Sequence, residues 1–207
     1  MPAVAAEAPE TGTGPRVTSP PEPILRLTVE QYHAMINHGI LVDDDPVELL
    51  EGWLVTKMPK NPRHRAATRL TTNTLERVVP DDWYVDSQEP ITTSDSEPEP
   101  DIVVVQGDTR QYLDRHPGPR ELALVVEVAD ATLQRDRTLK KRLYAAARVP
   151  VYWIVNLRDS VLEAHSDPTG EATDPTYRVH RDYSLDATVP LTIGDTETSI
   201  PVRDLFP

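Results

Sequence analysis

Cysteine is absent from the 207 residues of the chain, and its absence narrows the chemistry that the protein can perform. It excludes disulfides, zinc sites built from thiolates and cysteine nucleophiles. Carboxylates and six histidines remain as metal ligands. Any metal is therefore expected to be a hard ion bound mainly through oxygen.

Long apolar runs are also absent. No stretch of about 18 apolar residues occurs and no charged-then-apolar leader opens the chain, so neither a membrane span nor a signal peptide is predicted. We expect a cytoplasmic protein with no membrane partner. Residues 1–24 are rich in Pro, Ala, Gly, Ser and Thr and hold almost no large apolar side chain. Such a segment cannot bury enough surface to fold, which predicts a disordered tail before one domain over residues 25–207.

Basic residues are outnumbered in this sequence. Lys and Arg total 21 against 34 Asp and Glu, which gives a formal net charge of −13. This charge argues against non-specific nucleic-acid binding, because phosphate contacts need a positive surface. Two segments are basic in this acidic chain: residues 57–77 and 135–148 each hold six basic residues and one acidic residue. They are either two solvated helix faces or a surface that meets phosphate.

Local signals place the first elements of the domain. A capping box at Thr28 and Gln31 predicts the start of a helix. Glu51-Gly52 is typical of the turn between two short strands. Asn61 followed by Pro62 suits the N-cap and first position of a second helix.

The later part of the chain alternates strands with one helix. The strand candidates are rich in Val, Ile and aromatic residues and read WYVDSQ, DIVVV, LALVVEV and VYWIVN. Between the last two, RDRTLKKRLYAAA has the apolar spacing of a helix. This order predicts a βαβ unit with a parallel strand pair, and the alternating segments after residue 160 predict an antiparallel addition.

Two carboxylates stand in these otherwise apolar strands. Ala123, Val125 and Glu127 share one face of their strand, and Asp101 opens the run DIVVV. An ionised carboxylate in such a place costs several kcal/mol unless it is paired or bound to metal. If the two carboxylates lay about 5 Å apart, their repulsion would be roughly 3 kcal/mol, which a divalent cation would remove. Mg²⁺ suits such a site, because it is held by one or two carboxylates with water and substrate phosphate.

At this point the motifs resemble a known family. Pro100 and Asp101, then VVEVAD, then RDRTLKKRLYAAARVPVYWIVN, resemble the Uma-type putative restriction endonuclease family of the PD-(D/E)XK nuclease superfamily. The upstream VELLEGWLV and PRHR are similar to that family's acidic hairpin and its histidine at a helix start. The resemblance covers roughly residues 26–207. It implies a restriction-endonuclease-like α/β fold, with a central mixed sheet flanked by helices.

The resemblance also implies a site. Asp101 and Glu127 would hold Mg²⁺ or Mn²⁺, and Glu48 would add a further carboxylate. Many members carry a lysine two residues after the glutamate, where this chain has Ala129. In the Uma-type pattern the lysine lies on the following helix, and Lys140 matches it. Lys140 can orient the attacking water or offset the negative charge that develops during phosphodiester hydrolysis.

The implied activity is that of a metal-dependent endonuclease. DNA is the expected substrate, and RNA is a further possibility that shares the same site. A homodimer is expected, because cutting two strands usually needs two sites. His64 and Arg63, at the start of the second helix, are candidate phosphate contacts.

Other interpretations stay open on the residues alone. Asp101 could cap a turn. Glu127 and Lys140 could form a structural ion pair, as they would in a non-catalytic interaction or nucleic-acid-binding module on a nuclease scaffold, and the charge of −13 favours that alternative. Lys140 could instead pair with Asp136 on an exposed helix face.

Some further assignments depend on position alone. Glu51 lies in the same hairpin as Glu48, and either could be only a solvated strand residue. His64 could be an ordinary surface histidine. His165 and His180, like the other histidines, show no metal-ligand spacing, so no role is expected for them.

Overall fold

The computed structural model describes residues 24–42 and 45–207. Apart from Ile24, the predicted tail lies outside the described residues. Within the described residues no helix is both long and apolar enough to cross a membrane.

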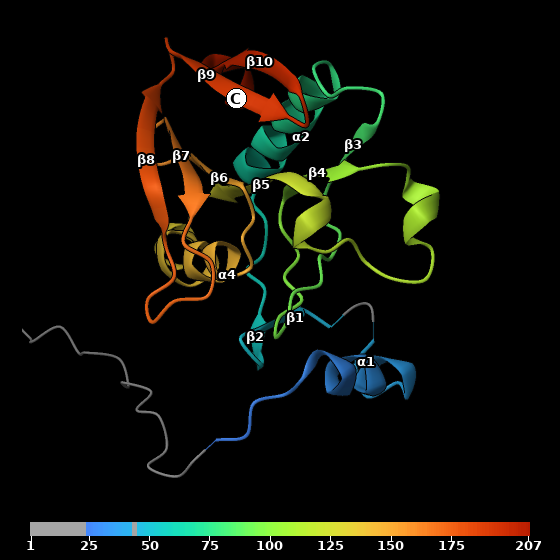
Figure 1. Cartoon of the computed structure of the whole chain (residues 1–207). Coiled ribbons are helices and arrows are strands. Elements are labelled where there is room, and N and C mark those ends of the chain that lie inside the picture. Colours follow the sequence, from blue (N-terminus) through green and yellow to red (C-terminus); the bar gives the residue numbers. More distant parts are fainter. Residues whose placement is uncertain (1–23, 43–44) are drawn as a thin grey trace, which may run out of the picture.

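A six-stranded mixed sheet forms the centre of the fold, as the sequence predicts (Figure 1). Its order is β3-β4-β5-β6-β7-β8, and only β5 and β6 run parallel, joined by the predicted helical crossover. The strands are β3 (Trp83–Asp86), β4 (Ile102–Gln106), β5 (Leu122–Ala129), β6 (Val151–Asn156), β7 (Val161–Pro168) and β8 (Tyr177–Ser184). Every residue of β5 is buried, so its apolar run reflects cover on both faces.

The two faces of the sheet are covered by different elements. Helix α2 (Pro62–Glu76) and a hairpin of β9 (Thr188–Ile193) and β10 (Thr196–Pro201) pack on one face, followed by the 3₁₀ turn η4 (Val202–Leu205). The other face carries the crossover helix, made of α3 (Leu133–Arg135), η3 (Asp136–Lys140) and α4 (Lys141–Ala146). Two further 3₁₀ turns, η1 (Thr109–Tyr112) and η2 (Pro119–Glu121), connect β4 to β5.

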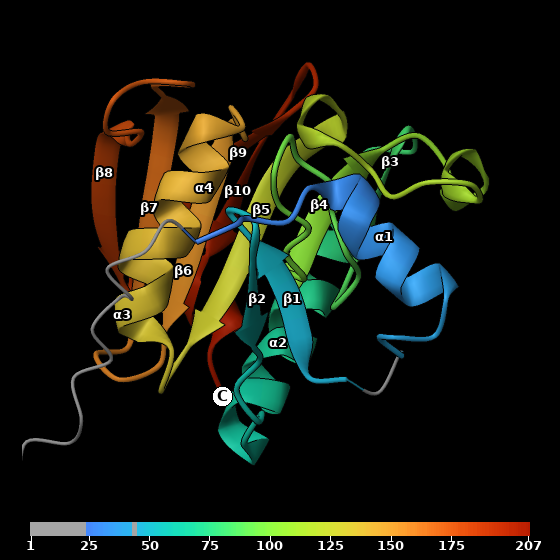
Figure 2. The ribbon, with the colours of Figure 1, turned by 90° about the horizontal axis from the view of Figure 1, so that it is seen from below.

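The hairpin of β1 (Val47–Leu50) and β2 (Trp53–Thr56) lies beside the crossover helix (Figure 2). Helix α1 (Val29–Asn37) precedes it and begins at the predicted capping box of Thr28 and Gln31. Asn61 caps α2 through a hydrogen bond from the His64 amide, with Pro62 in the first turn, again as predicted. These local signals therefore determine the residue at which each helix begins.

The turn of the β1–β2 hairpin depends on Gly52. Its φ is +78°, and a Cβ there would come within 2.6 Å of Arg26 Cβ and 2.9 Å of the Leu27 carbonyl oxygen. We expect Gly52→Ala to lower the free energy of unfolding by about 1–3 kcal/mol or more, because left-handed strain and a steric clash combine. Urea unfolding of the variant and the wild type measures this loss of stability.

Gly39→Ala is the matched control for that substitution. Gly39 has a similar φ of +67°, but a Cβ there would meet nothing within 4 Å. Its cost should therefore be the strain alone, roughly 1 kcal/mol. Equal losses in the two variants would show that the close approach of Arg26 and Leu27 to the hairpin contributes nothing to stability.

The crossover helix departs from the regular helix that the sequence predicts. It contains one π-helical turn, Asp136–Lys140, in which the Lys141 amide donates to the Asp136 carbonyl. Asp136 and Lys140 are both only 2% exposed. A single π turn inside an α-helix widens the coil and is frequent at functional sites. Here it accompanies the burial of two charged side chains on the face that meets the sheet.

Candidate active site

One cavity of about 70 Å³ gathers residues from five separate parts of the fold. Its lining includes Glu48 of β1, His64 of α2, Asp101 just before β4, Glu127 of β5 and Lys140 of η3. All of the sequence-predicted site residues except Arg63 therefore meet there.

Arg63 is exposed and does not line the cavity. The position of Arg63 therefore gives no support for a direct contact inside the cavity. Any phosphate that it contacts would lie on the outer surface of α2.

Asp101 is held by groups on two neighbouring elements. Its Oδ2 accepts a hydrogen bond of 2.9 Å from the Val128 amide and lies 3.0 Å from His64 Nε2. The register of β4 against β5 pairs Ile102 with Val126, which brings Asp101 to the end of β5 where Glu127 lies. The Asp101 side chain thus bonds across to β5 and α2, instead of capping a turn of its own.

Lys140 lies between two carboxylates. Its Nζ is 2.7 Å from Glu48 Oε2 and 3.3 Å from Glu127 Oε1. The alternative in which Lys140 pairs with Asp136 on an exposed helix face does not hold, because Lys140 is buried and its Nζ lies beside Glu48 and Glu127. The contact with Glu127 is the one that the structural ion-pair interpretation requires, and the position beside the carboxylates is the one that the nuclease resemblance implies.

The ambiguity between the two hairpin glutamates is resolved by position. Glu48 is 2% exposed and lines the cavity, and its Oε2 also accepts from the Glu99 amide. Glu51 instead receives a two-pronged hydrogen bond from Arg142, at 2.8 and 2.6 Å, away from the cavity lining. Glu48 is therefore the hairpin carboxylate that lines the cavity.

Each of the three carboxylates keeps one oxygen without a hydrogen bond to a described residue. These atoms are Glu48 Oε1, Asp101 Oδ1 and Glu127 Oε2, while the partner oxygen of each is bonded. Two of them form only long ion pairs, Glu48 Oε1 with Arg135 and Asp101 Oδ1 with Lys60, each at 3.9 Å. Oxygen donors with spare lone pairs in a small cavity fit a hard divalent cation such as Mg²⁺.

The electrostatics of the cavity follow from burial. Burial raises the pKa of Glu127 to about 8, although the Lys140 ammonium opposes the rise. Burial also raises the pKa of Asp136 to about 6, against a hydrogen bond from Thr132. For Lys140 burial disfavours the charge, but Glu127 and Glu48 outweigh it and its pKa rises, so the ammonium stays charged. Perturbed groups gathered in one cavity are typical of functional sites.

Sequence reasoning missed several residues of this site. The Tyr144 hydroxyl donates to Glu127 Oε1 at 2.7 Å, and Thr132 donates to Asp136 at 2.6 Å. Lys60 lines the cavity, as does Arg135. Tyr144 lies four residues after Lys140, so helical spacing on the cavity side of the crossover was the one signal that could have found it.

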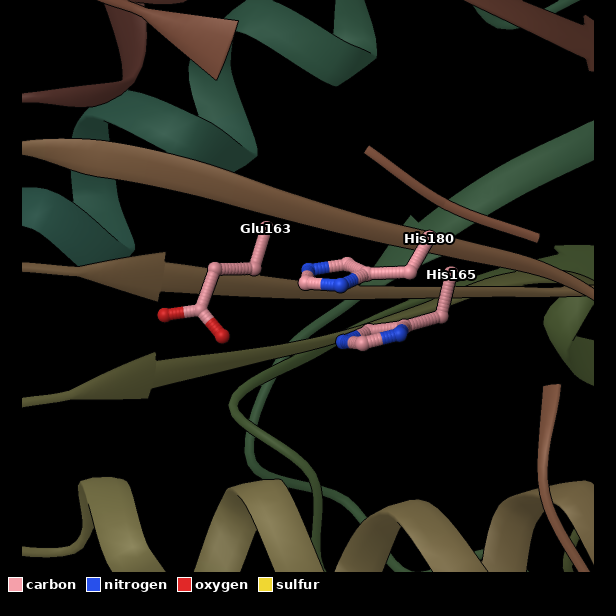
Figure 3. A group of neighbouring side chains, drawn as sticks. All are labelled: Glu163, His165 and His180. Atoms are coloured by element: carbon pink, nitrogen blue, oxygen red, sulfur yellow. The ribbon is translucent and has the colours of Figure 1, made fainter. Parts of the chain in front are cut away.

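A second group with metal-ligand geometry lies outside the cavity. Among the described residues, the group of three whose ligand atoms all lie within 4.8 Å of one another is Glu163, His165 and His180 (Figure 3). The sequence spacing of His165 and His180, from which no role was expected, does not indicate this group. Their 15-residue separation in sequence conceals a direct cross-strand pairing of β7 with β8.

Comparisons with known proteins give a family and a fold for the chain. A family model described as Uma2, putative restriction endonuclease, matches residues 29–197. Among solved structures, the crystal structure of a putative nuclease belonging to DUF820 from Anabaena variabilis is similar, with a TM-score of 0.61 and 16% sequence identity. The match covers 87% of this chain and 97% of that one. At this identity the likeness shows the fold alone. A search of curated proteins found no match.

Proposed function

Because the chain belongs to the Uma2 family of putative restriction endonucleases, we propose that it is a metal-dependent endonuclease that hydrolyses phosphodiester bonds of DNA. The observation that carries the proposal is the convergence of Glu48, Asp101, Glu127 and Lys140 on one cavity. With about 70 Å³, that cavity has room for an ion and a few waters but not for a nucleotide. A substrate would thus present only a phosphate at its mouth.

The proposed roles follow from the contacts of each residue. Asp101 and Glu127, with Glu48 as a further carboxylate, would hold Mg²⁺ or Mn²⁺ through the oxygens that make no protein hydrogen bond. Such an ion, when bound, polarises the phosphate and lowers the pKa of an attacking water. His64 holds Asp101 in place. Lys140 supplies a fixed positive charge beside the carboxylates, which offsets charge that develops on the phosphate.

A basic groove next to the cavity supports a nucleic-acid substrate. The groove encloses about 930 Å³ and is lined by Lys60, Arg65 and Arg69, with polar side chains between them. Lys60 and Asn61 line both the groove and the catalytic cavity. A phosphate backbone that follows α2 through this groove would therefore reach the carboxylates.

Replacing the arginines of the groove should weaken DNA binding. We expect Arg65→Gln/Arg69→Gln to reduce affinity about tenfold or more at low salt, and to lower the slope of log K against log salt by up to about 1.8, since each lost phosphate contact removes about 0.9. Fluorescence anisotropy in EDTA measures binding without cleavage.

The matched control for this variant removes two arginines elsewhere. Arg178→Gln/Arg181→Gln makes the same change of net charge at two exposed positions of β8. It should leave the salt slope unchanged. Equal effects of the two double variants would contradict a DNA path along α2.

The proposal includes a homodimer, because two sites are usually needed to cut both strands of DNA. It also places the protein in the cytoplasm. Light scattering coupled to gel filtration tests the dimer. A plasmid assay with Mg²⁺ or Mn²⁺ separates nicking from double-strand cleavage, and an RNA substrate of the same sequence tests the choice of nucleic acid. A monomer that only nicks would contradict the dimer but not the nuclease.

One observation favours a second candidate function, a non-catalytic interaction or nucleic-acid-binding module. Lys140 lies between Glu48 and Glu127 and forms an ion pair with one oxygen of each, as a structural ion pair would. Calorimetric titration with Mn²⁺ separates the two functions. A protein that binds no Mn²⁺, and whose Glu127→Gln variant is equally well folded and equally unresponsive, would be the non-catalytic module.

A further inference from the structure

Four polar side chains form a square on the outer two strands of the sheet, away from the proposed active site. Glu163 and His165 of β7 lie directly opposite Asp182 and His180 of β8. Opposite residues on paired strands share a face, with their Cβ atoms about 5 Å apart. Figure 3 shows the imidazoles of His165 and His180 stacked, with their outer edges toward the Glu163 carboxylate.

His165 is the unusual member of this square. It is 5% exposed, and its Nε2 is buried with no hydrogen-bond partner among the described residues. A buried polar atom without a partner costs about 1–3 kcal/mol. The rings of His165 and His180 are stacked, 4.4 Å apart and almost parallel. A ligand that bonds to Nε2 would remove that cost.

Glu163 has capacity for one more partner. Its Oε1 accepts from Arg137 and from Asn156, whereas its Oε2 accepts only one hydrogen bond, of 3.0 Å, from Arg137 Nε. Because each carboxylate oxygen carries two lone pairs, Oε2 can bind a cation while the Arg137 contact is kept.

His180 is oriented by an outer carboxylate. Its Nε2 lies 2.8 Å from Asp182 Oδ1, so a proton on Nε2 leaves Nδ1 with a free lone pair. Histidines that bind metals usually donate their other ring N–H to a carboxylate or carbonyl in this way.

We propose that Glu163, His165 and His180 form a binding site for a divalent transition ion of the Zn²⁺ class, distinct from the carboxylate cavity. Two imidazole nitrogens and one carboxylate oxygen are ligands that Zn²⁺ prefers over Mg²⁺, with water as the fourth. The site would fasten β8, which is the edge strand of the sheet, to β7.

Binding requires only a small movement. The ligand atoms lie within 4.8 Å of one another, whereas ligands around a tetrahedral Zn²⁺ with bonds of 2.0–2.1 Å are roughly 3.3 Å apart. His180 can close this gap by leaving the stack, because its side chain is 49% exposed. The same exposure gives the ion a path from solvent. Among the described residues, Arg137 is the one cation paired with Glu163, and its guanidinium bonds to both carboxylate oxygens.

The second site is separate from the cavity but lies on the same face of the sheet. Glu127 and Glu163 are the partners of Ile154 on its two sides, so they are two strand spacings, roughly 10 Å, apart. The crossover helix divides them, with Lys140 directed to Glu127 and Arg137 to Glu163. The donors differ as well, since the cavity offers mainly oxygen and the outer site mainly nitrogen.

Titration of the full chain with Zn²⁺ tests the site. The experiment uses protein without a histidine tag and carrying Asp101→Asn and Glu127→Gln, so that the cavity does not bind the ion. We expect calorimetry to show one equivalent of Zn²⁺ bound, with excess Mg²⁺ unable to compete, and the melting temperature to rise with Zn²⁺. Adding His180→Gln, an exposed and therefore tolerated substitution, should weaken binding at least tenfold and abolish the rise.

His38→Gln is the matched control, because His38 is an exposed histidine at the end of α1 and belongs to neither β7 nor β8. It should change nothing. Absence of Zn²⁺ binding in the Asp101→Asn/Glu127→Gln protein would overturn the proposal, as would equal binding by the His180→Gln and His38→Gln variants. Neither result depends on whether the protein cuts DNA.

Discussion

Glu127→Gln should reduce metal-dependent DNA cleavage by at least about 100-fold, the scale of losing one preorganised electrostatic partner of a transition state. The amide keeps the shape of the side chain and can still bond to Tyr144, but it removes the charge that would hold a divalent ion. Asp101→Asn should cause a similar loss, because its Oδ1 makes no protein hydrogen bond and is the other oxygen offered to the cavity. Initial rates on supercoiled plasmid with Mg²⁺ and with Mn²⁺ measure both effects.

Glu51→Gln is the control for this loss, since Glu51 pairs with Arg142 away from the cavity. It should leave the cleavage rate unchanged, and urea unfolding should show that all three variants are folded. Cleavage that survives both Asp101→Asn and Glu127→Gln would refute the proposed site, whatever the family of the chain.

Much of the fold and of the site could be predicted because a few residues act through local rules. Thr28, Asn61 and Gly52 set two helix starts and a turn, and the family resemblance read from the motifs is confirmed. Glu127 was detectable because it interrupts a strand that is apolar on both faces. Asp101 stood out in the same way, and the cavity brings both together.

The residues that escaped prediction depend on arrangements that sequence spacing does not express. The π turn has no Pro or Gly to announce it, yet it accompanies the burial of Asp136 and Lys140. His165 and His180 meet only through the register of β7 and β8. The strand β10 has one buried residue, Ile200, among polar neighbours, so its pattern is too weak to read.

Lys140→Met should destabilise the protein by about 3–5 kcal/mol, the usual cost of removing one partner from a buried ion pair. Methionine keeps much of the length of the side chain but leaves Glu48 and Glu127 facing each other without the ammonium that bonds both. Lys141→Met is the matched control. Lys141 is the next residue and does not line the cavity, so its loss should change stability by no more than about 0.5 kcal/mol. Urea unfolding in EDTA measures both.

Repeating that unfolding with Mn²⁺, with His180→Gln present in both proteins so that the outer histidine site does not bind the ion, tests whether Lys140 serves catalysis or only pairs with the carboxylates. If Glu48, Asp101 and Glu127 bind a divalent ion, Mn²⁺ should stabilise the Lys140→Met protein more than the wild type, because the ion takes over the charge that the ammonium supplied. Cleavage should remain low in the variant, since the cation that offsets charge on the phosphate is gone. If Lys140 is only a structural partner of the carboxylates, Mn²⁺ should leave the stability of both proteins unchanged. The same substitution therefore separates a lysine that serves catalysis from one that only neutralises the charge beside it.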